Sequence, residues 1–525
     1  MSQNALYNRY LHSPKVKQIA ENLEQPLAKI QLKGLLGSSF SFVFYSLFKN
    51  SEKPYLLIFN EKEEAAYYLN DLEQMIGAND VLFYPSSYRR PYQIEETDNA
   101  NVLLRSEVLN RIKSRKKPAV IVTYPEALFE KVVTRKELDK NTLKVAVGDN
   151  VSIDFINEVL FEYEFKRVDF ITEPGEFSVR GGILDVFSFS NDNPYRIEFF
   201  GNEVDSIRTF DVESQLSVEK QNKITIIPNL ENKFIQENRE SFLEYISDKT
   251  VLCIENTEFL TSQLDKLFGK AIETFDKLSK DVKHASPEHL FLNQDGFLRK
   301  ALDFSLIELS NKPLFKTTKT FEFHIQPQPS FNKQFDLLLN NLSDNHFHGY
   351  TNYLYCANEA QANRFHDIFE SIDEENHEDI RKQYHTVVAS LYQGFIDEEN
   401  QVACYTDHQI FERYHKFSIK NGYSKKQTIT LKELNSLSVG DYVTHIDHGI
   451  GKFGGLQKIQ VEGKTQEAIK LVYADNDIVY VSIHSLHKIS KYNGKDGTPP
   501  KIYKLGSNAW KALKQKTKAR VKHIA

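Results

Sequence analysis

The first third of the chain alternates short apolar runs with polar stretches of helical spacing. The apolar runs cover residues 39–48, 54–59, 80–85 and 118–125 and are rich in β-branched and aromatic side chains. Such runs predict strands. Strands that alternate with helices predict an α/β domain with a largely parallel sheet, preceded here by a helical pattern from Asn4 to Leu23.

The hydrophobic period changes from about Thr142. Four short segments at 175–181, 183–189, 195–201 and 205–211 alternate apolar and polar positions and are separated by turn residues. This pattern predicts an antiparallel β domain at 142–228. The α/β pattern then returns with the apolar run at 249–255. We therefore expect one α/β domain built from residues 1–141 and 229–332, interrupted by the β insertion.

The second half of the chain predicts three more parts. Residues 325–330, which read IQPQPS, are typical of a stiff boundary segment. Alternating apolar and helical stretches then predict a second, small α/β domain at 333–432. Five short strands with tight turns predict an SH3-like β barrel at 433–493. Residues 494–525 are expected to form a linker and a basic helix capped by Ser507 or Asn508.

Composition and cysteine usage narrow the class of protein. The mean hydropathy is −0.48, and no apolar run approaches the ~18 residues that a membrane span needs. The N-terminus has no apolar stretch typical of a secretory signal. The cysteines Cys253, Cys356 and Cys404 lie too far apart for a disulfide framework or a zinc site. These features predict a cytoplasmic protein.

The charge is unevenly distributed. The net charge is −6, yet residues 488–525 contain eleven Lys or Arg against one acid. An acidic body with a basic tail argues against nucleic-acid binding over the whole surface. The tail is interpreted either as a solvated helix or as a DNA-binding segment with salt-dependent affinity.

Residues 33–41 nearly match a nucleotide-binding P-loop. Gly34 takes the first glycine position, Gly37 lies within the loop, and Ser39 stands where the last glycine belongs. Phe40 replaces the lysine that would neutralise the phosphates, although Ser41 keeps the hydroxyl position. A degenerate nucleotide loop and a plain Gly/Ser turn before a helical run explain the pattern equally well. Either way, we expect no nucleotide cofactor here.

Other patterns that resemble catalytic or metal sites are rejected. The G-x-G-x-x-G match at 449–454 precedes a strand instead of a helix, so it lacks the helix N-terminus that binds a pyrophosphate. The acidic runs 373–375 and 397–399 are interpreted as solvated faces. Neither 377–385 nor the pair His445 and His448 offers a convincing set of metal ligands. The sequence therefore predicts no catalytic residues and no metal site.

The predicted β insertion carries a candidate interface. Period-2 alternation in 195–200 places Arg196, Glu198 and Phe200 on the face opposite the apolar one. Arg180 can lie nearby on a neighbouring strand. A cluster of arginines with an exposed aromatic residue is typical of a protein-interaction hot spot. The alternative is that Phe200 covers the end of a barrel.

Three segments of the chain resemble one known family. Residues 173–211 are similar to the signature shared by the repair helicase UvrB and the bacterial transcription-repair coupling factors (the Mfd family). Residues 437–492 resemble the CarD-like, RNA-polymerase-interacting domain of those factors, and 504–525 resemble the relay helix that leads into their motor. The order of the segments points to the coupling factors, so the chain is identified as resembling their N-terminal portion.

The resemblance implies partners and contact residues. Arg180, Arg196 and Phe200 match the family's UvrA-binding positions. The segment from Leu456 through Lys458 to Ile459 matches the hairpin that pairs with the β subunit of RNA polymerase by strand addition. The alternative for this hairpin is an ordinary barrel strand without a partner.

The resemblance also implies that this chain recruits UvrA to a stalled polymerase and so starts nucleotide excision repair. An ATP-driven DNA translocase is expected beyond Ala525, so ATP and Mg²⁺ are expected only with that motor, and the present chain is not expected to be an enzyme. The alternatives are a UvrB-like DNA repair helicase and a salt-dependent DNA-binding fragment. No function is predicted for 333–432.

Overall fold

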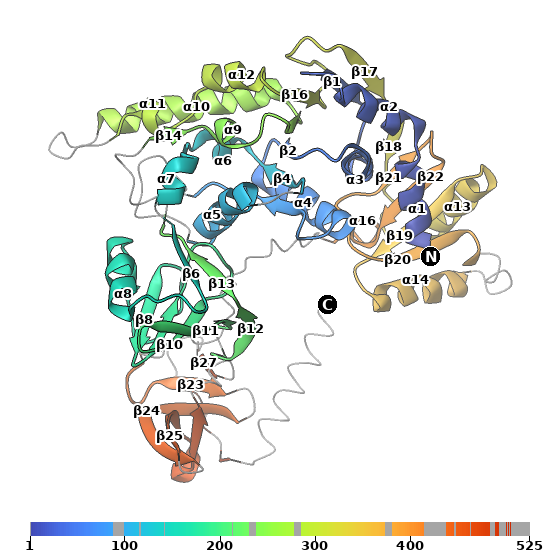
Figure 1. Cartoon of the computed structure of the whole chain (residues 1–525). Helices are drawn as coiled ribbons and strands as arrows, with labels where there is room; N and C mark the ends of the chain where they lie inside the picture. The colour runs from blue at the N-terminus through green and yellow to red at the C-terminus, as the bar shows by residue number, and fades with distance from the viewer. Residues whose placement is uncertain are drawn as a thin grey trace. The chain divides into compact units, whose positions relative to one another are not determined.

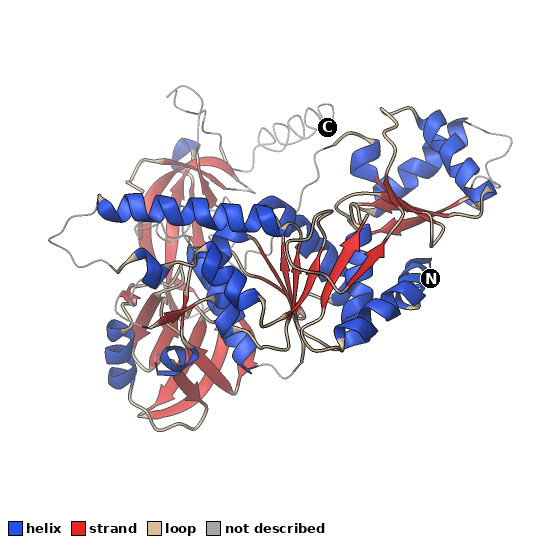
Figure 2. Cartoon of the chain, turned by 90° about the horizontal axis from the view of Figure 1, so that it is seen from above, coloured by secondary structure: helices blue, strands red, loops and turns tan. Residues whose placement is uncertain are grey.

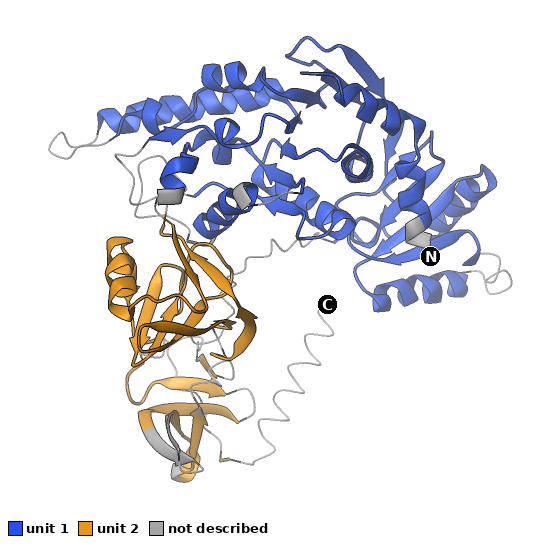
Figure 3. Ribbon diagram, viewed as in Figure 1, with its two compact units in different colours: residues 1–140, 230–421 blue, residues 141–229, 422–525 orange. Residues whose placement is uncertain are grey.

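The structure is a computed structural model that forms two compact units. It describes residues 2–87, 99–114, 117–140, 142–212, 214–229, 238–277, 285–372, 381–413, 437–445, 448–461, 464–482, 489–492, 500, 502, 504 and 505. One unit contains residues 1–140 and 230–421, and the other contains 141–229 and 422–525 (Figure 3). Among the described residues, none of the helices is long and apolar enough to cross a membrane.

A seven-stranded parallel sheet forms the centre of the first unit, and helices flank it (Figure 2). The strand order is β17-β1-β16-β15-β2-β4-β3. Figure 1 labels five of these strands, β1, β2, β4, β16 and β17. The strands are β1 (Lys29–Lys33), β2 (Tyr55–Ile58), β3 (Val81–Phe83), β4 (Val120–Thr123), β15 (Val251–Ile254), β16 (Ser305–Glu308) and β17 (Lys319–Glu322). Strands that precede the β insertion and strands that follow it therefore belong to one sheet. Strands β2, β4 and β15 are buried along their whole length, as expected for a covered parallel sheet.

Most of the helices in the described residues belong to this part of the first unit. They are α1 (Ser2–Leu11), α2 (Pro14–Leu23), α3 (Ser39–Ser51), α4 (Lys62–Ile76), α5 (Asn99–Ser114), α6 (Pro125–Phe129), α7 (Arg135–Lys140), α9 (Phe242–Tyr245), α10 (Thr257–Asp276), α11 (Pro287–Leu290) and α12 (Gln294–Ala301). The short strands β5 (Val132–Val133) and β14 (Arg239–Glu240) pair with each other.

One prediction for the N-terminal region is wrong, and another is confirmed in the form of two helices. The run 39–48 is not a strand but most of helix α3, and the strand beside it is the less apolar β1. Both the serines and the phenylalanines of this run are buried, because α3 is covered on several sides, and such a helix loses the usual 3.6-residue pattern. The helical pattern predicted from Asn4 to Leu23 is confirmed as two helices, α1 and α2. Pro14 begins the second helix, because proline cannot continue a helix interior.

A second, five-stranded sheet lies in the same unit. Its order is β18-β21-β22-β19-β20, with β18 (Ile325–Pro327), β19 (Thr351–Cys356), β20 (Tyr384–Val388), β21 (Phe395–Asp397) and β22 (Val402–Thr406). Its helices are α13 (Phe335–Phe347), α14 (Glu359–Ile372) and α16 (Asp407–Ile410). The segment predicted as a stiff boundary thus begins with β18, an edge strand antiparallel to β21. A loop, residues 389–394, connects β20 to β21.

The second unit contains a six-stranded sheet in the order β12-β11-β10-β9-β8-β7. All neighbouring pairs are antiparallel except β7 with β8. The elements are β7 (Lys166–Arg167), β8 (Glu176–Arg180), β9 (Ile183–Val186), β10 (Tyr195–Phe200), β11 (Glu203–Phe210) and β12 (Ser217–Gln221), with helix α8 (Ile153–Glu162) and the pair β6 (Leu143–Ala146) and β13 (Lys223–Ile226).

The C-terminal strands form an antiparallel sheet in the order β26-β25-β24-β23-β27. Its elements are β23 (Tyr442–His445), β24 (Gly449–Val461), β25 (Lys464–Val472), β26 (Ile478–Ser482) and β27 (Ile489–Lys491), with a 3₁₀ turn at Ala474–Asn476. Within the described residues β26 and β27 do not pair, so closure into a barrel stays a prediction. The predicted basic helix, from Ser507 to Ala525, lies outside the described residues. The coarser expectation of a mixed α/β protein with several sheets is confirmed.

Candidate interaction sites

One face of the six-stranded sheet carries the predicted arginines. Arg196 on β10 lies directly opposite Asp185 on β9. Its guanidinium donates two hydrogen bonds to the Asp185 carboxylate, Nε to Oδ1 at 2.7 Å and Nη2 to Oδ2 at 2.8 Å. Arg180 on β8 forms an ion pair with the same carboxylate. The structure therefore brings Arg180 and Arg196 together through Asp185, whose side chain is 2% exposed.

The two arginines differ in how much of each is available to a partner. The side chain of Arg196 is 15% exposed, and its guanidinium also lies over the Phe210 ring at 4.4 Å. The hydrogen bonds to Asp185 raise the pKa of Arg196, so this group is held charged and in place. Arg180 is 41% exposed and needs no rearrangement to reach a partner. Arg196 thus mainly stabilises the face through Asp185, and Arg180 is the arginine whose charge is accessible to a partner.

Phe200 lies at the end of β10 and is 83% exposed. Glu203 pairs with it across a two-residue turn that contains Gly201, whose φ is +63°. The alternative that Phe200 covers a barrel end does not fit this exposure. A large exposed aromatic ring at a hairpin tip, beside an ordered charged face, has the composition of an interaction hot spot.

Three polar residues of this face, Asp185, Ser206 and Arg208, were missed from the sequence. Asp185 holds both predicted arginines, and Glu198 accepts a hydrogen bond from Ser206 Oγ at 2.6 Å and pairs with Arg208. The signal was present, because period-2 alternation places Asp185 in β9 on the polar side of an otherwise apolar strand. Carboxylates opposite arginines then follow from cross-strand pairing.

The second candidate site is the C-terminal half of β24. A bulge between Phe453 and Leu456 changes the direction of the strand. The predicted contact residues follow the bulge, with Lys458 opposite Glu467 and Ile459 opposite Gln466 on β25. The other side of β24 pairs with β23 only at residues 449–452. Among the described strands, none pairs with the other side of 456–461. This half of β24 is therefore an edge that can accept an added strand, and Leu456 on it is 45% exposed.

The predicted nucleotide loop lies between β1 and helix α3, at the carboxyl end of a central parallel strand. This is where a P-loop stands in an α/β sheet. The Phe40 ring does not face the loop but packs in the core, with its centroid 4.5 Å from that of Phe44. Ser39 is buried and donates through Oγ to the Leu36 carbonyl at 2.6 Å.

Gly34 has a φ of +86°, and a Cβ there would stand 2.1 Å from the Phe323 carbonyl oxygen. The absence of a side chain at Gly34 therefore makes room for the backbone of Phe323 in the same chain.

No three described His, Cys, Asp or Glu residues form a group that could hold a metal ion. His445 and His448 stack at 4.6 Å as two aromatic rings. The run 397–399, interpreted from sequence as a solvated face, is partly buried: Asp397 accepts a hydrogen bond from the Tyr10 hydroxyl at 2.6 Å. The run 373–375 lies outside the described residues.

Comparison with known families matches two segments of the chain. Residues 143–231 match the model of the UvrB interaction domain, and residues 437–493 match the model of the CarD-like/TRCF RID domain. The first segment contains the arginine face and Phe200, and the second contains the β24 edge.

Curated relatives align over nearly the whole chain. The transcription-repair-coupling factor of Bacillus subtilis (strain 168) is 26% identical, with 97% of this chain and 49% of the relative covered. That of Haemophilus influenzae is 24% identical, with 86% and 44% covered. That of Staphylococcus aureus (strain bovine RF122) is 26% identical, with 95% and 48% covered. The chain thus spans about half the length of the curated relatives it matches.

Proposed function

This chain is a relative of the transcription-repair-coupling factors, and on that premise we propose that it is an adaptor that binds RNA polymerase and UvrA. The six-stranded sheet is the UvrA-binding part, and the five-stranded C-terminal sheet binds the polymerase β subunit. By bringing UvrA to a stalled polymerase, the chain would start nucleotide excision repair on the transcribed strand. The ATP-driven DNA translocase, with its ATP and Mg²⁺, would belong to the other half of the full-length relatives.

The observation that carries the proposal is the presence of two differently built interaction surfaces in the two segments that match the family models. One surface is a rigid charged face with an exposed aromatic tip at Phe200. The other is the open edge at 456–461, which suits strand addition by main-chain hydrogen bonds. We also retain the interpretations of 34–41 as a degenerate nucleotide loop and of the C-terminal sheet as an SH3-like barrel.

The first experiment measures binding of the chain to purified UvrA and compares Phe200→Ala with Phe347→Ala. Both phenylalanines are almost fully exposed, at 83% and 87%, so both changes remove the same exposed group and neither leaves a cavity. Loss of a hot-spot aromatic costs about 2 kcal/mol or more, roughly thirtyfold in affinity. We expect that loss for Phe200→Ala and unchanged affinity for Phe347→Ala.

Arg180→Ala is expected to weaken UvrA binding as well, because it removes an accessible charge and leaves Asp185 paired with Arg196. Arg196→Ala is a poorer probe, since it removes the main partner of a buried carboxylate and disturbs the sheet. Unchanged UvrA affinity in both Phe200→Ala and Arg180→Ala would show that this face is not the UvrA site.

A further inference from the structure

The loop 34–41 is filled by another part of the same chain. The segment 390–394, which connects β20 to β21, lies against it. The Ser38 amide donates to the Gln393 carbonyl at 3.1 Å, and the Gln393 amide donates back to Ser38 Oγ at 3.1 Å. A Cβ on Gly37 would stand 3.1 Å from that of Gln393 and 3.2 Å from the Gly394 carbonyl oxygen. In a P-loop, the glycines let the backbone approach a phosphate closely. In this chain, the backbone of the loop approaches the segment 390–394 instead.

One face of α4 binds the first half of the segment. Tyr67, Asp71 and Gln74 follow at four- and three-residue spacing, so they share a face of this helix. The Gln74 side-chain amide pairs with both backbone groups of Ser390, at 3.0 and 3.1 Å. Asp71 Oδ1 accepts from the Tyr392 amide at 2.9 Å. The Tyr67 and Tyr392 rings stack with centroids 4.4 Å apart and planes 10° from parallel.

A buried polar chain links the two halves of the contact. Asp71 Oδ2 accepts hydrogen bonds from Ser38 Oγ at 2.6 Å and from Ser41 Oγ at 3.1 Å. Ser38 Oγ in turn accepts from Gln393, so one carboxylate orders both the loop and the segment. Ser38, Ser41 and Asp71 are all fully buried. Buried polar groups that are fully hydrogen-bonded specify one arrangement, because any other arrangement leaves some of them unpaired.

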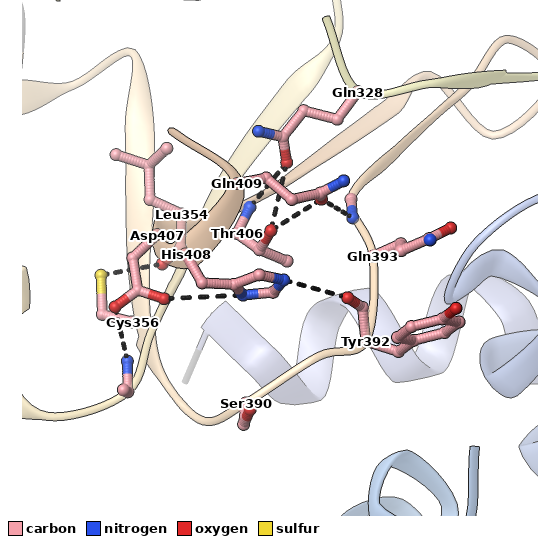
Figure 4. Close-up of polar contacts among 12 residues, drawn as sticks. Gln328, Leu354, Cys356, Ser390, Tyr392, Gln393, Thr406, Asp407, His408 and Gln409 are labelled. Atoms are coloured by element: carbon pink, nitrogen blue, oxygen red, sulfur yellow. Dashed lines mark hydrogen bonds and ion pairs between the residues drawn. The ribbon is translucent and has the colours of Figure 1, made fainter. Parts of the chain in front are cut away.

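The segment is held from its own side as well (Figure 4). The Gly394 amide donates to Gln409 Oε1 at 2.7 Å, and the Tyr392 carbonyl lies 3.1 Å from His408 Nε2. Thr406 also bonds Gln409, at 2.8 Å. The second α/β domain therefore holds 390–394 in place through its own hydrogen bonds, and the entropy lost on docking is small.

We propose that the 34–41 loop and α4 together form an internal peptide-binding site whose ligand is 390–394. On this proposal the second α/β domain has a defined role: it occupies the position of the nucleotide phosphates and fixes the two sheets of the first unit to each other. The inference is independent of the UvrA and polymerase sites, which lie in other segments.

The test is hydrogen–deuterium exchange of the whole chain, followed in a peptide that covers 390–394. Substitution of three buried serines, one at a time, removes different numbers of hydrogen bonds from the contact. Ser38→Ala removes the bonds to Gln393 and Asp71, and Ser41→Ala removes only the bond to Asp71. Ser46→Ala is the matched control, because the Ser46 hydroxyl on α3 has no hydrogen-bond partner in the structure.

We expect exchange at 390–394 to become about tenfold faster in Ser38→Ala, less so in Ser41→Ala, and to be unchanged in Ser46→Ala. Strand β19 reports the folding of the second domain itself and should keep its protection in all three. If Ser38→Ala prevents folding, Gln74→Ala is the substitute, since Gln74 is exposed and bonds only Ser390 in the segment. If residues 390–394 exchange at the same rate in Ser38→Ala, or in its substitute Gln74→Ala, as in Ser46→Ala, the proposal is wrong.

Discussion

At the scale of single residues, Asp71 makes the contact between the loop and 390–394 sensitive to pH. Burial raises the pKa of Asp71 to about 7, although hydrogen bonds from Ser38 and Ser41 act in the opposite direction. When the segment leaves its site on the loop and α4, the carboxyl group meets water and its pKa falls towards the ordinary value of about 3.9. The docked state therefore binds this proton more tightly than the open state.

The sign of the pH effect follows from that difference. The contribution of Asp71 to docking is fully present below about pH 4 and is lost as the pH rises through about 7. We expect the protection of 390–394, corrected for intrinsic exchange rates, to fall by up to about tenfold per unit between pH 5 and pH 7 and to level off above that. Hydrogen exchange in the range pH 5–8 measures it.

Asp71→Asn is the control for this prediction, because the amide cannot titrate. Other groups near the contact titrate too: burial lowers the pKa of His408 and raises that of Glu64 to about 8, with Glu255 adding to the rise. The tyrosines Tyr68, Tyr355 and Tyr392 also face this region, and burial raises their pKa values. All of them remain in Asp71→Asn, so an equal pH slope in that variant would rule out Asp71 as the sensor.

Residue-level reasoning from the sequence succeeded where a local rule applied. Alternation along 195–200 correctly separates Arg196 from the core-facing Ile197, since the period of a strand is 2 whatever surrounds it. It could not show that Arg196 is already bound by Asp185 and that Arg180 is the freer group. That distinction depends on cross-strand register, which is set by the turns and the core together.

At the scale of elements, the run 39–48 shows why composition misleads. Its phenylalanines and alternating serines satisfy a strand pattern, but helix α3 buries both, so the helical period leaves no polar stripe in the sequence. The C-terminal strands were easier to predict, because one-sided antiparallel strands keep a visible alternation. The open edge at 456–461 needed the structure, since pairing partners are not encoded within a single strand.

The β24 edge leads to a prediction for RNA polymerase binding. Ile459→Ala removes an apolar side chain from the edge proposed to pair with the polymerase. Ile478→Ala, on the opposite edge strand β26 where Ile478 is 43% exposed, is the matched control. We expect about tenfold weaker binding for Ile459→Ala, in line with an interface residue that costs more than ~1 kcal/mol, and little change for Ile478→Ala. The measurement is affinity for core polymerase. The reverse order of effects would place the contact on β26.

At the scale of the molecule, the sequence separated the α/β parts from the β parts but gave no account of how the second α/β domain is used. The contacts that 390–394 makes with the loop and with α4 join residues more than 300 positions apart. Neither segment has a local pattern that marks it as half of an interface. Long-range docking depends on surfaces that exist only after each sheet has formed, and for this reason pattern analysis of one chain does not find it.

An adaptor has to hold both partners at once, and this requirement gives the last prediction. The two proposed surfaces lie on different sheets and share no residue, so neither partner needs to displace the other. We expect UvrA affinity to change less than about threefold when the chain is saturated with polymerase, which corresponds to a coupling free energy below ~0.7 kcal/mol.

Size-exclusion chromatography should show a complex that contains all three components. Phe200→Ala should leave the polymerase complex intact and lose UvrA, and Ile459→Ala should do the opposite. Mutual exclusion of UvrA and polymerase on the unaltered chain would contradict the adaptor function, even if each partner binds alone.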